Sequence, residues 1–171
     1  MKIVSWNVNS LKARSDYVQL YLDTHDPDIL CIQELKLETN KVPVEIFTSR
    51  GYEVSIFGQK QWNGVMIASK FPITSVHKGL KPADAGQSRL IAATINGIRI
   101  VNLYCPRGQS ADSEKFIYKK SFYDRLIEWI KENYSSSEQV LILGDFNIAP
   151  EPCDVYDVQL FHNVPTYHPD E

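Results

Sequence analysis

Short apolar runs alternate with helix-like segments along this 171-residue chain. The runs that predict strands are Lys2–Trp6, Asp28–Gln33, Tyr52–Phe57, Gly64–Ala68, Arg89–Ile95, Ile98–Tyr104 and Gln139–Leu143. The segments that predict helices are residues 12–24, 43–50 and 113–133. This alternation is typical of an α/β fold in which helices cover a sheet.

The helices are predicted from apolar residues at helical spacing. Residues 12–24 carry Tyr17, Leu20 and Tyr21 at that spacing, and the Asp-Pro pair that follows ends the helix. Residues 113–133 are the clearest helix, with Asp112 or Ser113 as its cap. Its expected apolar stripe consists of Phe116, Phe122, Tyr123, Leu126, Ile127 and Ile130.

Two further segments stand out by their turn residues. The Asn96-Gly97 dipeptide between two apolar runs predicts a tight hairpin. Residues 149–171 contain four prolines and no periodic pattern, so no element is expected there. Such a long structureless tail is uncommon in a compact domain. We therefore expect residues 1–171 to form a single domain that is incomplete at its C-terminus.

Composition indicates an ordinary globular protein. The net charge of −3 does not by itself indicate nucleic-acid binding. It does not exclude it, because a divalent cation held by carboxylates reverses the local sign of charge. The three cysteines, Cys31, Cys105 and Cys153, form no C-x-x-C pair and are expected to be reduced thiols. No signal peptide or membrane-spanning run is predicted, so we expect a cytoplasmic location.

Polar residues follow four of the apolar strands. They are Asn7, Glu34, Tyr104, Asp145 and Asn147. Strand ends meet at the rim of a sheet, where crevices form, so these side chains could converge. Hard oxygen ligands without a cysteine or histidine cluster favour Mg²⁺, with Mn²⁺ as an alternative. Metal-assisted hydrolysis of a phosphate ester is the corresponding reaction class. The competing interpretation is that Asp145 and Asn147 merely form an Asx turn around Phe146.

Seven segments are similar to one known family. They are Lys2–Arg14, Pro27–Lys36, Asn63–Lys70, Ser88–Ile91, Val101–Pro106, Asp112–Lys119 and Gly144–Pro150. In this order and spacing they resemble the exonuclease III and abasic-site endonuclease branch of the endonuclease/exonuclease/phosphatase superfamily. The Gln-Glu and Gly-Asp-Phe-Asn signatures suit the whole superfamily, whereas Gln-Glu-Leu-Lys and Asp-Ser-Glu-Lys-Phe point to the DNA repair branch.

The resemblance implies a four-layered α/β sandwich, with two mixed β-sheets packed face to face, helices outside and the C-terminal part lacking. It implies that Glu34 is the chief Mg²⁺ ligand and that Asn7 lies beside it. Asp145 would activate or orient the attacking water, Asn147 would hold the scissile phosphate, and Tyr104 would bond to that phosphate or transfer a proton. Lys36 and Arg89 are implied as phosphate or structural contacts, and the alternative for each is a solvated surface role.

The chain also departs from the family pattern. Arg107 stands where the family commonly has Asn, and an arginine there could still contact DNA phosphate. The family's lesion-probing loop and late Asp-His pair have no counterpart, since His162 and His168 lie too early and in another context.

The leading hypothesis is therefore a Mg²⁺-dependent nuclease of base-excision repair that acts on double-stranded DNA at abasic sites or 3′ ends. This chain alone is expected to be weakly active or inactive, and no membrane or obligate protein partner is expected. One alternative is a non-catalytic DNA- or protein-binding remnant of the fold. Another is a hydrolase of the same superfamily that acts on a non-DNA phosphoester.

Overall fold

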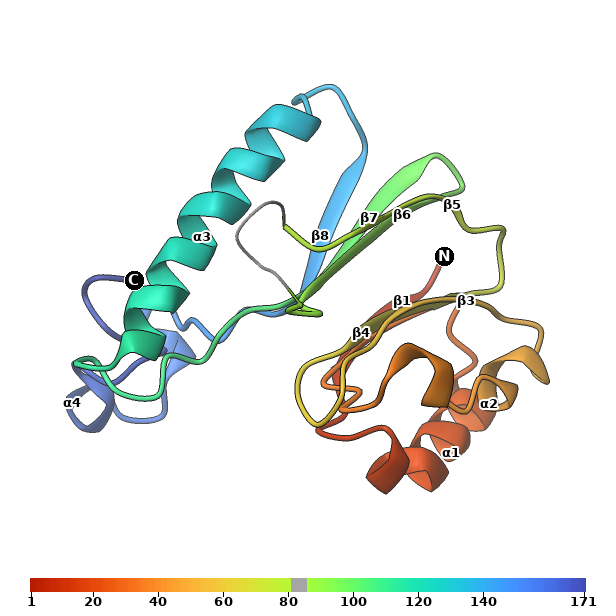
Figure 1. The fold of residues 1–171 in the computed structure, drawn as a ribbon, viewed down its shortest axis with the longest axis horizontal. Coiled ribbons are helices and arrows are strands. Elements are labelled where there is room, and N and C mark those ends of the chain that lie inside the picture. Colours follow the sequence, from red (N-terminus) through yellow and green to blue (C-terminus); the bar gives the residue numbers. More distant parts are fainter. Residues whose placement is uncertain (81–85) are drawn as a thin grey trace. The chain divides into compact units, whose positions relative to one another are not determined.

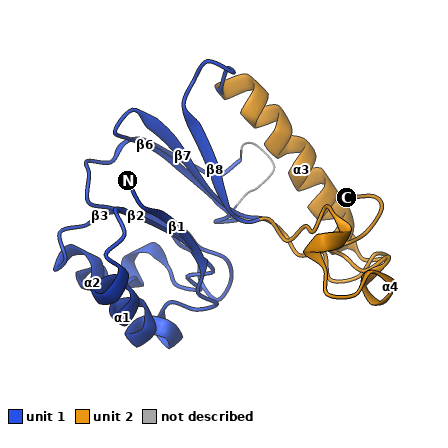
Figure 2. Ribbon diagram, turned by 180° about the vertical axis from the view of Figure 1, so that it is seen from behind, with its two compact units in different colours: residues 1–104, 134–145 blue, residues 105–133, 146–171 orange. Residues whose placement is uncertain are grey.

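The computed structural model describes residues 1–80 and 86–171 (Figure 1). It divides the chain into two compact units (Figure 2). Unit 1 comprises residues 1–104 and 134–145, and unit 2 comprises residues 105–133 and 146–171. The chain thus passes from unit 1 to unit 2 twice, directly after Tyr104 and directly after Asp145. The single-domain organisation expected from the sequence stays a prediction.

Unit 1 is built on two four-stranded sheets. The first has the order β1 (Ile3–Asn7), β2 (Ile29–Gln33), β4 (Val65–Ser69), β3 (Glu53–Phe57). The second has the order β5 (Thr74–Lys78), β6 (Leu90–Ile95), β7 (Ile98–Tyr104), β8 (Val140–Asp145). The β1–β2 and β7–β8 pairs are parallel and the other pairs are antiparallel, so both sheets are mixed. The predicted pair of mixed sheets is confirmed.

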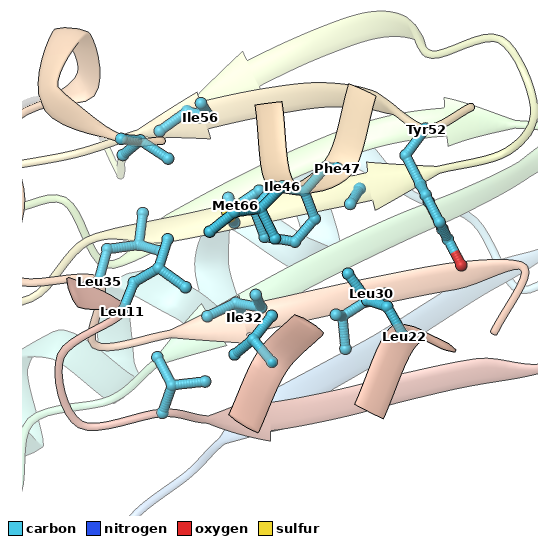
Figure 3. Packing of buried hydrophobic residues seen from close by; sticks show 14 residues of the cluster. Leu11, Leu22, Leu30, Ile32, Leu35, Ile46, Phe47, Tyr52, Ile56 and Met66 are labelled. Atoms are coloured by element: carbon cyan, nitrogen blue, oxygen red, sulfur yellow. The ribbon is translucent and has the colours of Figure 1, made fainter. Parts of the chain in front are cut away.

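The strands of the first sheet are apolar on both faces because each face contacts a different layer. The face toward the second sheet contributes Ile29, Cys31, Val65 and Ile67 to a cluster with Ile91 and other β6 and β7 residues. The opposite face is covered by α1 (Ser15–His25) and α2 (Glu45–Thr48) (Figure 1). There Leu30, Ile32 and Met66 pack against Leu22 and Phe47 (Figure 3). Burying a side chain such as Phe47 stabilises the fold by roughly 1.5–3 kcal/mol.

Two predictions about unit 1 differ from the structure. The residues of α1 that face the core are Val18 and Leu22, whereas Tyr17 and Leu20 are exposed. The helical spacing of Tyr17, Leu20 and Tyr21 therefore did not identify the core face, because of the three only Tyr21 is half-buried. Strand β5 was not predicted at all, since its sequence is largely polar and its residues are mostly exposed.

The turn that was predicted from sequence is among the remaining features of unit 1. The Asn96-Gly97 hairpin turn is confirmed, with φ values of 50° and 78° that suit a two-residue turn. Two short 3₁₀ helices, Lys12–Arg14 and Thr39–Lys41, complete the unit. Cys31 and Cys105 are buried free thiols, and Cys153 is exposed and free.

Unit 2 contains the long helix α3 (Glu114–Asn133), a 3₁₀ turn (Pro152–Asp154) and α4 (Val158–Phe161). Ser113 caps α3, because its Oγ accepts a hydrogen bond from the Phe116 amide at 3.2 Å. On α3 the stripe prediction holds for Phe116, Phe122 and Leu126, but Ile127 is exposed and Trp129 is buried instead.

The expectation of no element in residues 149–171 was wrong. The Asp157 carboxylate accepts hydrogen bonds from the amides of Gln159 and Leu160 and so starts α4. A buried ion pair then joins Lys119 to Glu171, with 2.6 Å between Nζ and Oε1. Within the described residues, the helices are too short or too polar to span a bilayer.

Candidate active site

The candidate site lies where four strands of unit 1 end. Strands β1, β7 and β8 end at Asn7, Tyr104 and Asp145, and Glu34 follows the last residue of β2. Strand pairing brings these ends together, because Asn7 pairs with Gln33 and Tyr104 pairs with Asp145. Parallel pairing aligns the strand ends within each sheet, and the packing of β1 and β2 against β7 and β8 brings the two pairs of ends together.

Asn7 bridges the two carboxylates of the site. Its Nδ2 donates to Glu34 Oε1 at 2.9 Å and to Asp145 Oδ2 at 2.8 Å. The orientation of this amide is further fixed by its Oδ1, which accepts the Asn9 amide at 2.9 Å. Two carboxylates therefore converge on a single amide, an arrangement that repulsion would oppose unless donors or a cation neutralised it.

Tyr104 donates its hydroxyl to the Glu34 carboxylate. Burial, this hydrogen bond and the negative charges of Glu34 and Asp145 raise the pKa of Tyr104 above its usual value. The phenol is therefore a protonated donor at neutral pH rather than a phenolate base.

Two cationic side chains adjoin these residues. Lys36 Nζ lies 3.0 Å from Glu34 Oε2 and also donates to Asn9 Oδ1. The Arg89 guanidinium lies over the Tyr104 ring, 5.0 Å from its centroid, and donates to the Tyr104 carbonyl at 3.2 Å. Both cations thus contact side chains of the site rather than standing alone in solvent.

The other two predicted residues belong to unit 2. Asn147 follows Asp145 by two positions, has a left-handed backbone (φ 52°), and donates from Nδ2 to the Cys105 carbonyl at 2.9 Å. Its own carbonyl accepts a hydrogen bond from Lys119 Nζ at 2.7 Å. Arg107 is exposed. The structure therefore brings Asn7, Glu34, Tyr104 and Asp145 together with Lys36 and Arg89, and describes Asn147 and Arg107 within the other unit.

The donor set of unit 1 fits a hard divalent cation. The Glu34 and Asp145 carboxylates supply oxygen atoms, and Mg²⁺ commonly takes only one or two carboxylates from a protein. The described residues include no cluster of three or more histidine, cysteine or acidic side chains that could hold a metal. The residues present thus match a cation that keeps most of its ligands as water or phosphate, and not a zinc site.

Sequence reasoning missed a layer of buried polar residues beneath this site. Gln33 and Asn102 are almost fully buried between the two sheets, where Gln33 Nε2 donates to Asn102 Oδ1 at 2.7 Å. The signal was present, since each is a polar residue at an inward position of an otherwise apolar strand.

The ionisation of Glu34 makes stability depend on pH. Burial raises the pKa of Glu34, but hydrogen bonds from Asn7, Lys36 and Tyr104 outweigh it and hold the pKa below its ordinary value of 4.5. A lowered pKa contributes stability that is present above about pH 4.5 and is lost as pH falls through the lowered value. Thermal unfolding followed by circular dichroism should thus show a larger loss between pH 6 and pH 3 for the natural chain than for Glu34→Gln. Parallel curves would contradict this.

Comparison with known proteins agrees with the geometry. Residues 4–159 match the model of the Endonuclease/Exonuclease/phosphatase family. The chain is 33% identical to exodeoxyribonuclease III of Haemophilus influenzae, over 91% of this chain and 60% of that protein.

Two solved structures are also similar. An AP endonuclease from Archaeoglobus fulgidus has a TM-score of 0.96 and 39% identity. A 3′ phosphatase from Neisseria, bound to a product DNA hairpin, has a TM-score of 0.94 and 41% identity. In each case 99% of this chain and 66% of the other chain are covered, so the chain spans about two thirds of the length of these relatives. The exonuclease III resemblance is confirmed, and the chain belongs to the Endonuclease/Exonuclease/phosphatase family.

Proposed function

We propose that this chain carries the Mg²⁺-dependent phosphodiesterase centre of a base-excision repair nuclease. Its activities would be abasic-site endonuclease and 3′–5′ exodeoxyribonuclease, with double-stranded DNA as substrate and Mn²⁺ as an alternative cation. The observation that carries the proposal is the convergence of Glu34 and Asp145 on Asn7 at the sheet edge. The DNA substrate is supported by the relatives, among them an exodeoxyribonuclease III, an AP endonuclease and a phosphatase bound to DNA.

Glu34, with Asn7 beside it, would hold the cation. When bound, Mg²⁺ would neutralise phosphate oxygens and polarise the phosphorus toward attack. Asp145 would accept a proton from the attacking water or orient it, since an ionised carboxylate is an acceptor only. Its register opposite Tyr104 would aim both groups at one phosphate.

Tyr104 would act as a donor to the phosphate, because its raised pKa keeps the hydroxyl proton. Fixed donors aimed at developing charge lower the barrier without reorganisation during the reaction. Asn147 would hold the scissile phosphate. Lys36 and Arg89 would supply positive charge next to the carboxylates, and Arg107 would contact the DNA backbone.

The proposal is tested with a duplex that carries one abasic site and an excess of residues 1–171. We expect slow or no strand cleavage in Mg²⁺, because the resemblance assigns a further Asp-His pair to the family that these residues do not include. Any cleavage should vanish in EDTA and in Asp145→Asn. Denaturing gel electrophoresis measures the product, and metal-dependent binding of the duplex is followed by fluorescence anisotropy.

The outcomes separate the hypotheses. Rapid turnover would contradict the expected need for the Asp-His pair, and cleavage that persists in EDTA would contradict metal dependence. Metal-dependent DNA binding without cleavage, unchanged by Asp145→Asn, would favour a non-catalytic binding module. Cleavage of a non-DNA phosphoester with no DNA binding would favour the other hydrolases of the superfamily.

A further inference from the structure

A buried polar layer crosses the sandwich of unit 1 directly beneath the candidate site. Asn102 on β7 is fully buried, yet its amide satisfies every hydrogen-bonding group it has. Its Nδ2 donates to two carbonyls of the opposite sheet, Ile32 at 3.0 Å on β2 and Met66 at 2.9 Å on β4. Because carbonyl oxygens can only accept, these partners fix the orientation of the amide.

Gln33 extends the layer to the neighbouring strands. Its Nε2 lies 2.7 Å from Asn102 Oδ1, 3.1 Å from Ser5 Oγ and 3.2 Å from the Cys31 carbonyl, so its two hydrogens are shared among these three acceptors. The layer therefore connects β1, β2 and β4 in the first sheet to β7 in the second. An unsatisfied amide in this position would be costly, whereas a fully bonded one selects a single packing of the two sheets.

The residues of the layer are one or two positions along the chain from Asn7, Glu34 and Tyr104 of the site. Residues two apart on a strand share a face, so Ser5 lies below Asn7 and Asn102 lies below Tyr104. Gln33 immediately precedes Glu34 and pairs with Asn7. The Glu34–Tyr104 hydrogen bond joins the two sheets, and its geometry therefore depends on how closely and in what register the sheets approach.

We propose that Asn102, together with Gln33, is a positioning residue that sets the approach of the two sheets and so holds Glu34, Asn7 and Tyr104 in cation-binding geometry. This inference rests on the proposed function for the identity of the site. Neither side chain touches the reacting groups, and their effect passes through the strand ends that carry them. An apolar layer of equal volume would hold the sheets together without this directional constraint.

The test replaces the layer rather than breaking it. Gln33→Met with Asn102→Leu removes both side chains of the Gln33–Asn102 hydrogen bond but leaves the Ile32 and Met66 carbonyls without the Asn102 donor. The double variant should therefore stay folded with a moderate loss of thermal stability, comparable to that of the control below. Its Mn²⁺ affinity, measured by electron paramagnetic resonance, should fall by about tenfold or more, as expected when groups that orient metal ligands are lost. The control is Ile100→Ala, which shortens a buried side chain on the same face of β7, two residues from Asn102. It should lower thermal stability while leaving Mn²⁺ affinity within about twofold of the natural chain.

A metal-free measurement keeps the two proposals distinguishable. The ¹³Cζ resonance of Tyr104, assigned with Tyr104→Phe, reports the hydrogen bond to Glu34 and should shift in the double variant but not in Ile100→Ala. The positioning role is overturned if both affinity and resonance are unchanged in the double variant, or if Ile100→Ala lowers affinity equally. If the natural chain binds no Mn²⁺, the proposed cation site fails, and the Tyr104 resonance alone decides the positioning role.

Discussion

Gly144→Ala should prevent residues 1–171 from forming the native pairing of β7 and β8. A Cβ at this position would lie 2.1 Å from the Leu103 carbonyl oxygen, which is backbone and cannot rotate away. The φ angle of +139° is also one that side-chain-bearing residues rarely adopt. Strain and overpacking together should cost about 4 kcal/mol, a large share of the stability of a small domain. Urea unfolding followed by tryptophan fluorescence measures the loss.

The matched control is Gly97→Ala. Gly97 also has positive φ, at +78°, but a Cβ there would meet nothing within 4 Å. Only the conformational strain should appear, about 1–2 kcal/mol. Equal losses for the two variants would show that the contact with Leu103 is relieved by a small backbone shift. Gly144 immediately precedes Asp145, so its close approach to β7 is also what sets Asp145 opposite Tyr104.

Glu34→Gln should abolish divalent cation binding at micromolar to low millimolar concentrations. The substitution keeps the shape of the side chain and its acceptor oxygen but removes the charge that a hard cation requires. We expect affinity for Mn²⁺ to fall by about a hundredfold, equivalent to about 2.7 kcal/mol. Isothermal titration calorimetry at neutral pH measures the change, because the hydrogen bonds to the Glu34 carboxylate outweigh its burial and leave it ionised there.

Glu38→Gln supplies the comparison for charge. Glu38 is a surface carboxylate near Glu34 in sequence, and its Oε2 lies 2.9 Å from Lys41 Nζ. Removing it changes net charge by the same amount without touching Asn7 or Asp145, so affinity should not change. Cation binding that survives Glu34→Gln, or that is lost equally in Glu38→Gln, would rule out Glu34 as the chief ligand.

The sequence was sufficient for those parts of the fold that depend on local burial. Residues Ile29–Ile32 are apolar because both faces of β2 are covered, and Glu34 just after the strand marks the sheet rim. Strand β5 could not be found this way, since only His77 of its five residues is even partly buried. On α1, helical spacing of apolar residues predicted the helix but not its core face, since Tyr17 and Leu20 are exposed whereas Val18 and Leu22 face the sheet.

The sequence marked Gln33 and Asn102 as polar residues within strands, but it could not show that their side chains meet. Gln33 and Asn102 lie 69 positions apart in sequence, and no local pattern indicates that their side chains meet. The same holds for the contact of Asn7 with Asp145, 138 positions away. Motif resemblance identified Asn7 and Asp145, but only the packing of β1 against β8, from opposite sheets, explains how the Asn7 amide reaches the Asp145 carboxylate.

Glu34 and Lys36 both adopt left-handed backbone angles, with φ of 56° and 54°. For residues that bear a Cβ this conformation costs roughly 1–2 kcal/mol each, and glycine escapes most of that cost. Glycine at position 34 or 36 would relieve this cost but would also remove the side-chain bonds to Asn7 and Asn9 that offset it, and at position 34 it would remove the proposed cation ligand as well. Engineering a more thermostable variant of this chain that still binds a cation therefore requires keeping Glu34 and Lys36 unchanged while other positions are varied.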